Sequence, residues 1–343
     1  MKRTQNPPGA TPCEFDSRLG HVIPPHIDRQ KRPASRDDLF LSYVCELCAK
    51  GREGGMELNW GHLSADARIG GGLFDVIRLF THFYLAPGQK LKLPNPTYLC
   101  LSFHAHQNEV PAGLPLRLDL QLRAAFGDKF SDPRQVDMIW NSIGPGYPFI
   151  GSARIGLTGW ELPKSGLYFF HTRIDGKPVG KVGLSVLPAP GSTVRPYTGA
   201  KRGFKLEWGH VTDHIEPHAA GVISLHGISD FLVLPKHVDF VLLSAELAVL
   251  VSGGPDDGPD HEIQYVLVDS DDKPQGEPLV RKLQGQQIEK GGRWYYSDAV
   301  RLQDVMLEGG HDYTFRLSID GNLLPDSVSY WALKANDFKL ETR

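Results

Sequence analysis

Glu57-Leu58-Asn59-Trp60-Gly61-His62-Leu63-Ser64 has a counterpart 148 residues later, in Lys205-Leu206-Glu207-Trp208-Gly209-His210-Val211-Thr212. A second pattern is repeated at an offset of 145 residues. It matches Tyr168-x-Phe170 and Ile174-Asp175-Gly176 with Tyr313-x-Phe315 and Ile319-Asp320-Gly321. A period of this size is that of an ordinary domain and far exceeds the repeat of a solenoid. The sequence therefore predicts two tandem domains of one fold, called here the first copy (56–187) and the second copy (204–338).

Composition places the chain among globular proteins. Its 343 residues are 41% hydrophobic and 22% charged, and 37 glycines with 26 prolines favour many short elements joined by turns. The formal net charge of -3 provides no overall basic field for gripping phosphate groups. Nucleic acid is therefore not expected as a partner of the folded domains.

Three segments flank or join the copies. Residues 1–36 combine basic side chains with prolines, which predicts a solvated, disordered arm. In 37–55, capping residues precede apolar residues at helical spacing, so we expect a short helix and a connector, although alternate apolar residues there also fit a strand. Residues 188–203 are rich in proline and glycine and are predicted to be a linker.

Within the copies, apolar residues alternate with polar ones at the two-residue period of strands. Leu58, Trp60 and His62 share one parity, which we assign to the core together with the parity of Ile77 and Phe83 in the next predicted strand. The later strands are expected at Tyr98 to His104, Leu116 to Leu122, Phe149 to Leu157, Phe240 to Val251, Ile263 to Val268 and Trp294 to Leu302.

A hairpin is predicted to close each copy. Asp175-Gly176 and Asp320-Gly321 stand between alternating apolar runs, and Asp-Gly suits a type I′ turn because both central residues need positive φ. Tyr168 and Tyr313 begin these hairpins, each six residues after a leucine. This spacing resembles the tyrosine corner of Greek-key sandwiches, in which the phenol hydroxyl bonds to backbone a few residues upstream.

The order of these features resembles a known kind of domain. A strand, a glycine-bounded turn, an apolar strand ending near proline, then Gly166-Leu167-Tyr168-Phe169-Phe170 and Ile174-Asp175-Gly176 are similar to small bacterial immunoglobulin-like β-sandwich domains of unknown function. The second copy departs by one residue, because Gly310 lies three residues before Tyr313. The resemblance implies an all-β chain of two tandem Greek-key, immunoglobulin-like sandwiches. It implies no active site, since such a family carries no established chemistry.

Trp60-Gly61-His62 and Trp208-Gly209-His210 are the repeated trios that contain a titratable side chain. In one interpretation, Trp60, His62, Trp208 and His210 line a binding pocket at one end of each sandwich. In the other, which the shared parity favours, tryptophan fills the core, glycine permits close packing or a bulge, and the histidine ring is hydrogen-bonded.

Metal ligation is a minor hypothesis. Cys45-x-x-Cys48 has zinc-ligand spacing, with Cys13, His21 and His26 as conceivable partners, but a single cysteine pair matches no standard zinc motif. His210, His214 and His218 would leave one face of a strand roughly 13 Å apart, too far for one metal ion. The aspartates at 256–257 and 269–272 suit turns better than calcium. No cofactor is predicted.

Location and function are inferred mainly by exclusion. The N-terminal residues lead into no apolar segment, and the longest apolar run, Phe240 to Val251, is too short to span a bilayer, so a cytoplasmic protein without membrane partners is expected. The repeated fold without a repeated catalytic constellation favours a non-catalytic binding or scaffolding protein that recognises another protein. One alternative is an enzyme or small-ligand binder using a cleft between the copies or the Trp-Gly-His strand ends, and the other is a zinc-organised adaptor using Cys45 and Cys48.

Overall fold

All regular secondary structure in the residues that the computed structural model describes is β-strand, which confirms the predicted all-β class. The described residues are 56–70, 73–105, 116–125, 134–142, 149–189, 203–218, 222–287 and 292–335. The predicted arm (1–36), the predicted short helix (37–55) with Cys45 and Cys48, and most of the predicted linker (188–203) lie outside them. Within these ranges, no helix is long and apolar enough to cross a membrane.

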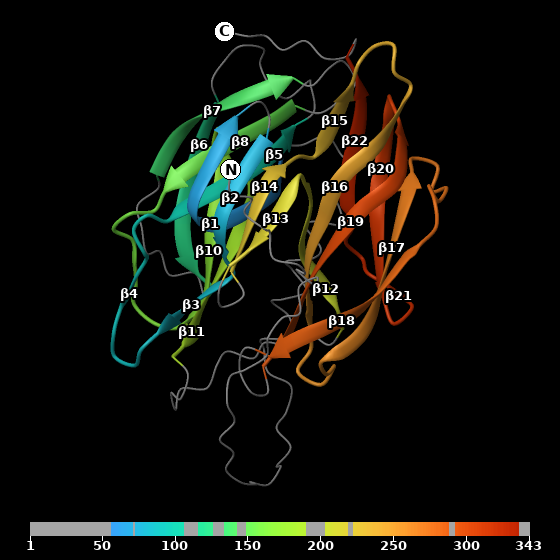
Figure 1. Cartoon of the computed structure of the whole chain (residues 1–343). Helices are drawn as coiled ribbons and strands as arrows, with labels where there is room; N and C mark the ends of the chain where they lie inside the picture. Colours follow the sequence, from blue (N-terminus) through green and yellow to red (C-terminus); the bar gives the residue numbers. More distant parts are fainter. Residues whose placement is uncertain are drawn as a thin grey trace, which may run out of the picture. The chain divides into compact units, whose positions relative to one another are not determined.

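Within the described residues, each copy forms eleven strands, and those of the first are coloured from blue to green in Figure 1. They are β1 (Glu57–Gly70), β2 (Leu73–Phe80), β3 (His82–Leu85), β4 (Leu91–Lys92), β5 (Tyr98–Ala105), β6 (Leu116–Ala124), β7 (Arg134–Ser142), β8 (Phe149–Gly156), β9 (Glu161–Leu162), β10 (Gly166–Ile174) and β11 (Lys177–Pro188).

The second copy contributes another eleven, coloured from yellow-green to red. They are β12 (Lys205–Thr212), β13 (His214–Pro217), β14 (Ile223–Ile228), β15 (Phe231–Leu234), β16 (Phe240–Gly253), β17 (Asp260–Asp269), β18 (Leu279–Gln287), β19 (Trp294–Glu308), β20 (His311–Ile319), β21 (Asn322–Leu323) and β22 (Val328–Lys334).

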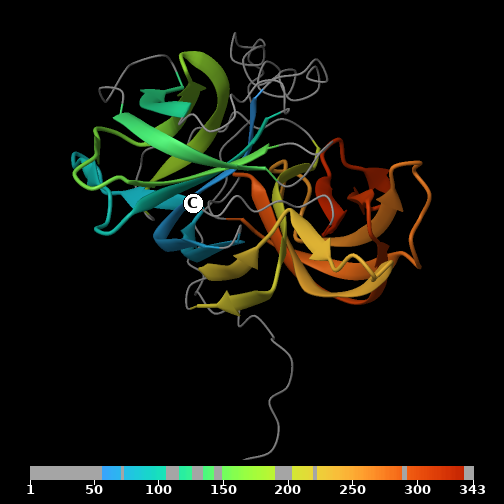
Figure 2. The ribbon, with the colours of Figure 1, turned by 90° about the horizontal axis from the view of Figure 1, so that it is seen from above.

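Hydrogen bonding joins these strands into two long curled sheets. The first runs β13-β14-β2-β1-β5-β8-β7-β6-β10-β11-β3, and the second runs β12-β16-β19-β18-β17-β20-β22-β15 with β21 beside β20. The short strands β4 and β9 pair separately. The hairpin of β13 and β14 thus belongs by sequence to the second copy but extends the sheet of the first, as Figure 2 shows.

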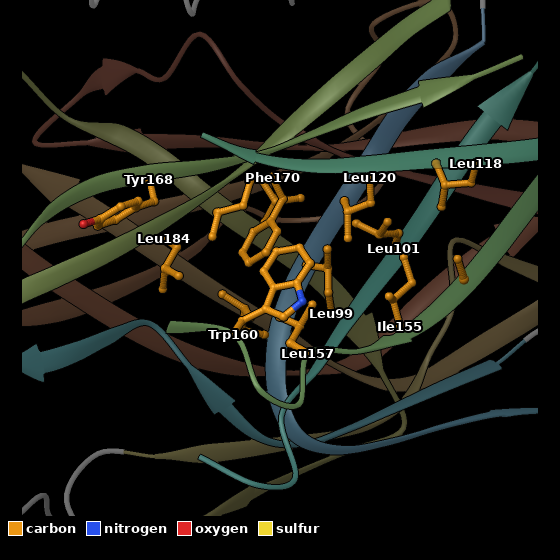
Figure 3. Close-up of a cluster of buried hydrophobic side chains, with 14 of the residues drawn as sticks. Leu99, Leu101, Leu118, Leu120, Ile155, Leu157, Trp160, Tyr168, Phe170 and Leu184 are labelled. Atoms are coloured by element: carbon orange, nitrogen blue, oxygen red, sulfur yellow. The ribbon is translucent and has the colours of Figure 1, made fainter. Parts of the chain in front are cut away.

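Each copy has its own apolar core. Figure 3 shows part of the first, where Leu99, Leu120 and Phe170 from three strands and Trp160 from the turn between β8 and β9 point toward one another. The second core is centred on the inward faces of β16, β17, β19 and β20, including Leu247, Tyr265 and Phe315. Alternating burial along β6 and β20 shows the two-residue period that the sequence predicted.

The predicted hairpin turns and tyrosine contacts are confirmed. Asp175 and Gly176 have φ of 47° and 79°, and Asp320 and Gly321 have φ of 50° and 77°. The Tyr168 hydroxyl donates to the Lys164 carbonyl at 2.6 Å. The Tyr313 hydroxyl accepts from the Glu308 amide at 2.7 Å.

Other strand predictions need correction. The second predicted strand is two strands, β2 and β3, which belong to different parts of the sheet and pair with β1 and β11. Ile77 is therefore only partly buried, while Phe83 lies in the first core. Strands β7 and β18 had no predicted counterpart, and β18 is hard to see in the sequence because most of its side chains are exposed and polar.

Candidate functional site

The repeated Trp-Gly-His trios follow a β-bulge in each copy. Between β1 and β5, Leu58 is opposite Phe103 but Trp60 is opposite Ser102, so Asn59 is an extra residue. Between β12 and β16, the same shift falls at Glu207, between Leu206 and Trp208. An extra residue reverses which face the following side chains occupy.

The bulge corrects the predicted orientation of Trp60 and His62. Leu58 packs against the first core, but after the bulge Gly61 faces that core, where an added Cβ would overlap Val182. Trp60 and His62 therefore lie on the opposite face of the sheet. In the second copy, Gly209 likewise faces Val328. The expected need for glycine was right, but the tryptophans do not fill the sandwich cores.

Trp60 and Trp208 meet instead in a third apolar cluster, called here the copy interface, because both copies contribute to it. Its members are Trp60, Ala67, Phe74, Val76, Leu79, Tyr98 and Cys100 from the first copy, and Trp208, Ile215, Ile223, Leu225, Ile228 and Ala248 from the second. Strand β14 borders it and pairs antiparallel with β2, with Leu225 opposite Val76. Leu225 is the sequence counterpart of Ile77, so each of these strands faces its own equivalent.

Four aromatic rings occupy the centre of the copy interface. Trp60 stacks on His62 with ring centroids 5.4 Å apart, and Trp208 stacks on His210 at 5.6 Å. Each tryptophan also meets the other copy's histidine edge-on, at 5.2 Å for Trp60 and His210 and 5.6 Å for Trp208 and His62. The contacts of one copy are thus repeated by the other, as in an isologous interface.

The two histidines are hydrogen-bonded to each other. Nε2 of His62 and Nε2 of His210 are 2.6 Å apart, and both side chains are buried. One ring must therefore donate its Nε2 hydrogen to the lone pair of the other. Burial lowers the pKa of His62 to about 4, and burial together with the neighbouring His62 lowers the pKa of His210 well below its usual value. Both rings are neutral at pH 7.

The surroundings of this pair offer little further chemistry. Cys100 is opposite His62 across β1 and β5, and its counterpart opposite His210 is Ala248. The Cys100 thiol lies 3.5 Å from the Ser64 hydroxyl, and burial raises its pKa to about 11. Such a thiol is protonated and weakly nucleophilic. No group of three or more metal-ligating side chains comes together within the described ranges.

Other predicted ligands are dispersed. His210 is buried, whereas His214 and His218 lie on the β13–β14 hairpin, where His218 Nε2 is 2.6 Å from the Ser224 hydroxyl. The Asp269 carboxylate accepts the amides of Asp271 and Lys273, as in a turn.

A second contact between the copies involves His104, on β5. Its ring packs edge-on against Trp331 at 4.9 Å, and its Nε2 lies 3.6 Å from Asp230. Asp230 also accepts from the Asn59 side chain at 2.9 Å. The bulge residue of the first copy thus holds the second copy, which fixes the two copies against each other at a second point.

Sequence reasoning missed an uncovered surface of the second copy. Phe240, Leu242 and Met306, named here the apolar strip, are 51%, 63% and 56% exposed, and Leu242 lies opposite Met306 across β16 and β19. In the first copy, Lys92 lies opposite Glu161 across β4 and β9 at the matching place. Comparing the two copies position by position would have revealed this exchange of a charged pair for an apolar one.

A cavity of about 250 Å³ adjoins the apolar strip. Its walls come from the end of β12, the start of β16, the β14–β15 junction, β15 and β22, and include Thr212, Asp213, Ser229, Leu232, Leu242 and Tyr330. The Tyr330 pKa is raised by burial and by the negative charges of Asp213 and Asp230. The cavity therefore combines apolar walls with a negative potential.

Comparisons with known proteins leave the family open. No family model matches the chain, and no curated protein matches it. Among solved structures, it is similar to a hypothetical protein from Parabacteroides merdae, with 10% identity, 75% of this chain and 55% of that chain covered, and a TM-score of 0.19.

Two further solved structures are similar at the same low level. A putative beta-galactosidase from Bacteroides fragilis has 10% identity, 81% and 40% coverage and a TM-score of 0.23. A Parabacteroides merdae beta-glucuronidase has 9% identity, 80% and 35% coverage and a TM-score of 0.17. The chain spans 55% or less of the length of these three structures. TM-scores this low establish neither a shared fold nor a shared activity.

Proposed function

We propose that this chain is a non-catalytic binding protein that recognises another protein through its second copy. The observation that carries the proposal is the apolar strip of Phe240, Leu242 and Met306, each more than half exposed. Large apolar side chains gathered on one surface are typical of interaction sites. The first copy, with Lys92 and Glu161 at the matching place, provides the contrast.

The buried aromatic rings support a scaffolding role for the rest of the molecule. Trp60, His62 and His210 are each at most 8% exposed, and Trp208 is half-buried. Their contacts are made with one another, so we assign them to holding the copies together. A rigid scaffold presents a binding surface at lower entropic cost than a flexible one.

The proposal includes the architecture expected from the sequence. Each copy is taken as a Greek-key, immunoglobulin-like sandwich, and the pair as products of a duplication. Support comes from the tyrosine contacts, from the parallel pairing of β3 with β11 and β15 with β22, and from the bulge shared by β1 and β12. Membership of the bacterial family that the sequence resembles is part of the same proposal.

We also propose an intracellular location. Cys100 is a free, buried thiol, and Ala248 takes its place in the second copy. A thiol that is not in a disulfide, as for Cys100 among the described residues, fits a reducing compartment better than an oxidising one.

The test is capture of partner proteins from the native source by the tagged full chain, compared with Leu242→Asp and Met306→Asp variants. Binding should be lost in both variants. The matched control is Leu323→Asp, because Leu323 is 65% exposed and lies away from the strip on β21. Reconstitution with each purified partner by calorimetry then measures the affinity directly.

Two outcomes contradict the proposal. If the strip variants and the Leu323 variant capture the same proteins with equal affinity, the strip is not the recognition surface. If small-molecule screening instead finds a ligand or substrate turnover that requires the cavity beside Tyr330, the alternative of an enzyme or small-ligand binder is favoured.

A further inference from the structure

One edge of β16 is unpaired in its first half. Strand β12 pairs with β16 from Ser252 to Glu246 and goes no further. At Asp213 the chain bends away, and β13 pairs with β14 in the other sheet. Residues Phe240 to Ala245, called here the β16 edge, have β19 on one side, with a shift of register at Ser244, and no described strand pairs with them on the other.

The first copy blocks the equivalent edge with proline. Leu93 and Leu243 correspond, as do Thr97 and Ala245, because each stands at the same place relative to the neighbouring strands. Between them the first copy has Pro94-Asn95-Pro96, and the second copy has Ser244 alone. Proline lacks an N–H and so protects an edge against added strands, whereas serine retains the donor.

The cavity lies along this same edge. Residues 241–245 form one of its walls, and Leu232 and Tyr330 lie among the others. Its volume of about 250 Å³ is below the roughly 300–1,000 Å³ of pockets that hold whole small molecules. It suits a single side chain projecting from a strand that runs beside β16.

Charge indicates which side chain fits. Asp213 is exposed at the cavity wall, and no basic side chain among the described residues forms an ion pair with it. The counterpart of Asp213 in the first copy is Ala65. The counterpart of Tyr330 is Leu184, because Leu184 lies opposite Tyr168 and Tyr330 lies opposite Tyr313. The carboxylate and the phenol are thus both particular to the second copy, and together they complement a cation.

We propose that an extended segment of a partner protein adds to the β16 edge as a further strand and places a lysine or arginine side chain in the cavity beside Asp213 and Tyr330. This inference rests on the proposed binding function and specifies how the partner is held. Backbone hydrogen bonds along Val241 to Ala245 would provide affinity, and the cavity and the apolar strip would select side chains.

The test begins with random peptides displayed on phage and selected on the full-length protein. Enriched peptides should alternate apolar residues with one lysine or arginine. Their affinities are then measured with synthetic peptides on wild type, Ser244→Pro and Ser244→Ala. We expect the proline variant to weaken binding by roughly tenfold or more and the alanine variant to retain it, because only proline removes the donor.

A second set of measurements tests the cavity. Replacing the peptide's basic residue by alanine should weaken binding to wild type by roughly tenfold, and Asp213→Asn should remove most of that difference. Thermal unfolding of every variant checks that the fold is kept. If Ser244→Pro does not fold, a peptide N-methylated at alternate amides replaces it, since it removes donors from the ligand instead.

The outcomes separate this inference from the proposed function. One result would overturn strand addition and leave the binding function intact. In it, peptides lose affinity with Leu242→Asp, but their affinity is unchanged by Ser244→Pro and by N-methylation. No enriched peptide, together with no effect of the strip variants on partner capture, would overturn both. Concentration-dependent dimers abolished by Ser244→Pro would assign the β16 edge to a second copy of this chain and overturn the partner assignment.

Discussion

The two copies are most alike where they touch each other and most different at the edge beside the apolar strip. At the copy interface, the bulge, the tryptophan, the glycine and the histidine occupy the same positions in β1 and β12. At the β16 edge, a single serine stands where the first copy has two prolines.

The difference shows that contacts between counterpart residues constrain the sequence at the copy interface and not at the β16 edge. In a two-fold arrangement, a residue of one copy contacts its own counterpart or that counterpart's neighbours, so a change in one copy disturbs both. His62 and His210 contact each other, and each tryptophan contacts both histidines. The outward edges lack this reciprocal contact between counterparts, so the two copies can differ there.

The largest expected effect is a loss of stability that differs between variants of the two tryptophans. Trp60→Ala should destabilise the protein by about 3–5 kcal/mol, because a fully packed indole is lost. Trp208→Ala should cost less, since Trp208 is only half-buried. Urea unfolding of both variants measures the difference, and equal losses would show that the copy interface is more symmetric than its burial indicates.

Acid should weaken the copy interface. The pKa of His62 is about 4 in the folded protein and about 6.5 when unfolded, so below pH 6.5 the unfolded state takes up a proton that the folded state does not. Above pH 6.5, His62 makes its full contribution to the free energy of unfolding. At pH 5 that free energy is lower by about 2 kcal/mol.

The measurement is the free energy of unfolding between pH 7 and pH 5. A double variant, His62→Leu with His210→Leu, removes both rings at once and leaves no unpaired nitrogen behind. Its stability should fall less steeply with acid than that of wild type. Parallel curves for the two proteins would exclude the histidine pair as the source.

Substitution of Gly61 and Gly209 tests whether β1 and β12 are equivalent. Gly61→Ala and Gly209→Ala should each destabilise by about 1–3 kcal/mol, because the new methyl group overlaps Val182 in one copy and Val328 in the other. Gly183→Ala is the control, since its nearest neighbour would be 3.8 Å away. A neutral Gly209→Ala beside a costly Gly61→Ala would break the equivalence of β1 and β12.

The corner tyrosines carry the smallest expected effect. Tyr168→Phe and Tyr313→Phe each remove a hydroxyl that is hydrogen-bonded to backbone, at a cost of about 1 kcal/mol. Thermal unfolding of both single variants and the double variant should show additive losses, because the residues lie in separate cores. A loss confined to one variant would indicate that the two corners differ.

Local patterns were predictable from the sequence, and contacts between copies were not. Asp-Gly turns and the tyrosine spacing depend on neighbouring residues, so both were found. The orientation of Trp60 was wrong because a bulge adds one residue without altering the alternation of residue types. The pairing of β14 with β2 joins residues far apart in the sequence, such as Leu225 and Val76, and no local signal in β14 indicates it.

The hydrogen bond between His62 and His210 has one more consequence. Two chemically identical rings share a single bridging hydrogen, so they cannot both adopt the same tautomer. The duplicated halves are therefore inequivalent at the atom where they meet. Exchanging the roles of the two neutral rings moves two hydrogens, because the bridging hydrogen passes to the other Nε2 and the former acceptor gives up its Nδ1 hydrogen while the former donor gains one. The strand partners of the two rings differ, with Cys100 opposite His62 and Ala248 opposite His210, and nitrogen chemical shifts of the imidazoles would report which arrangement is preferred.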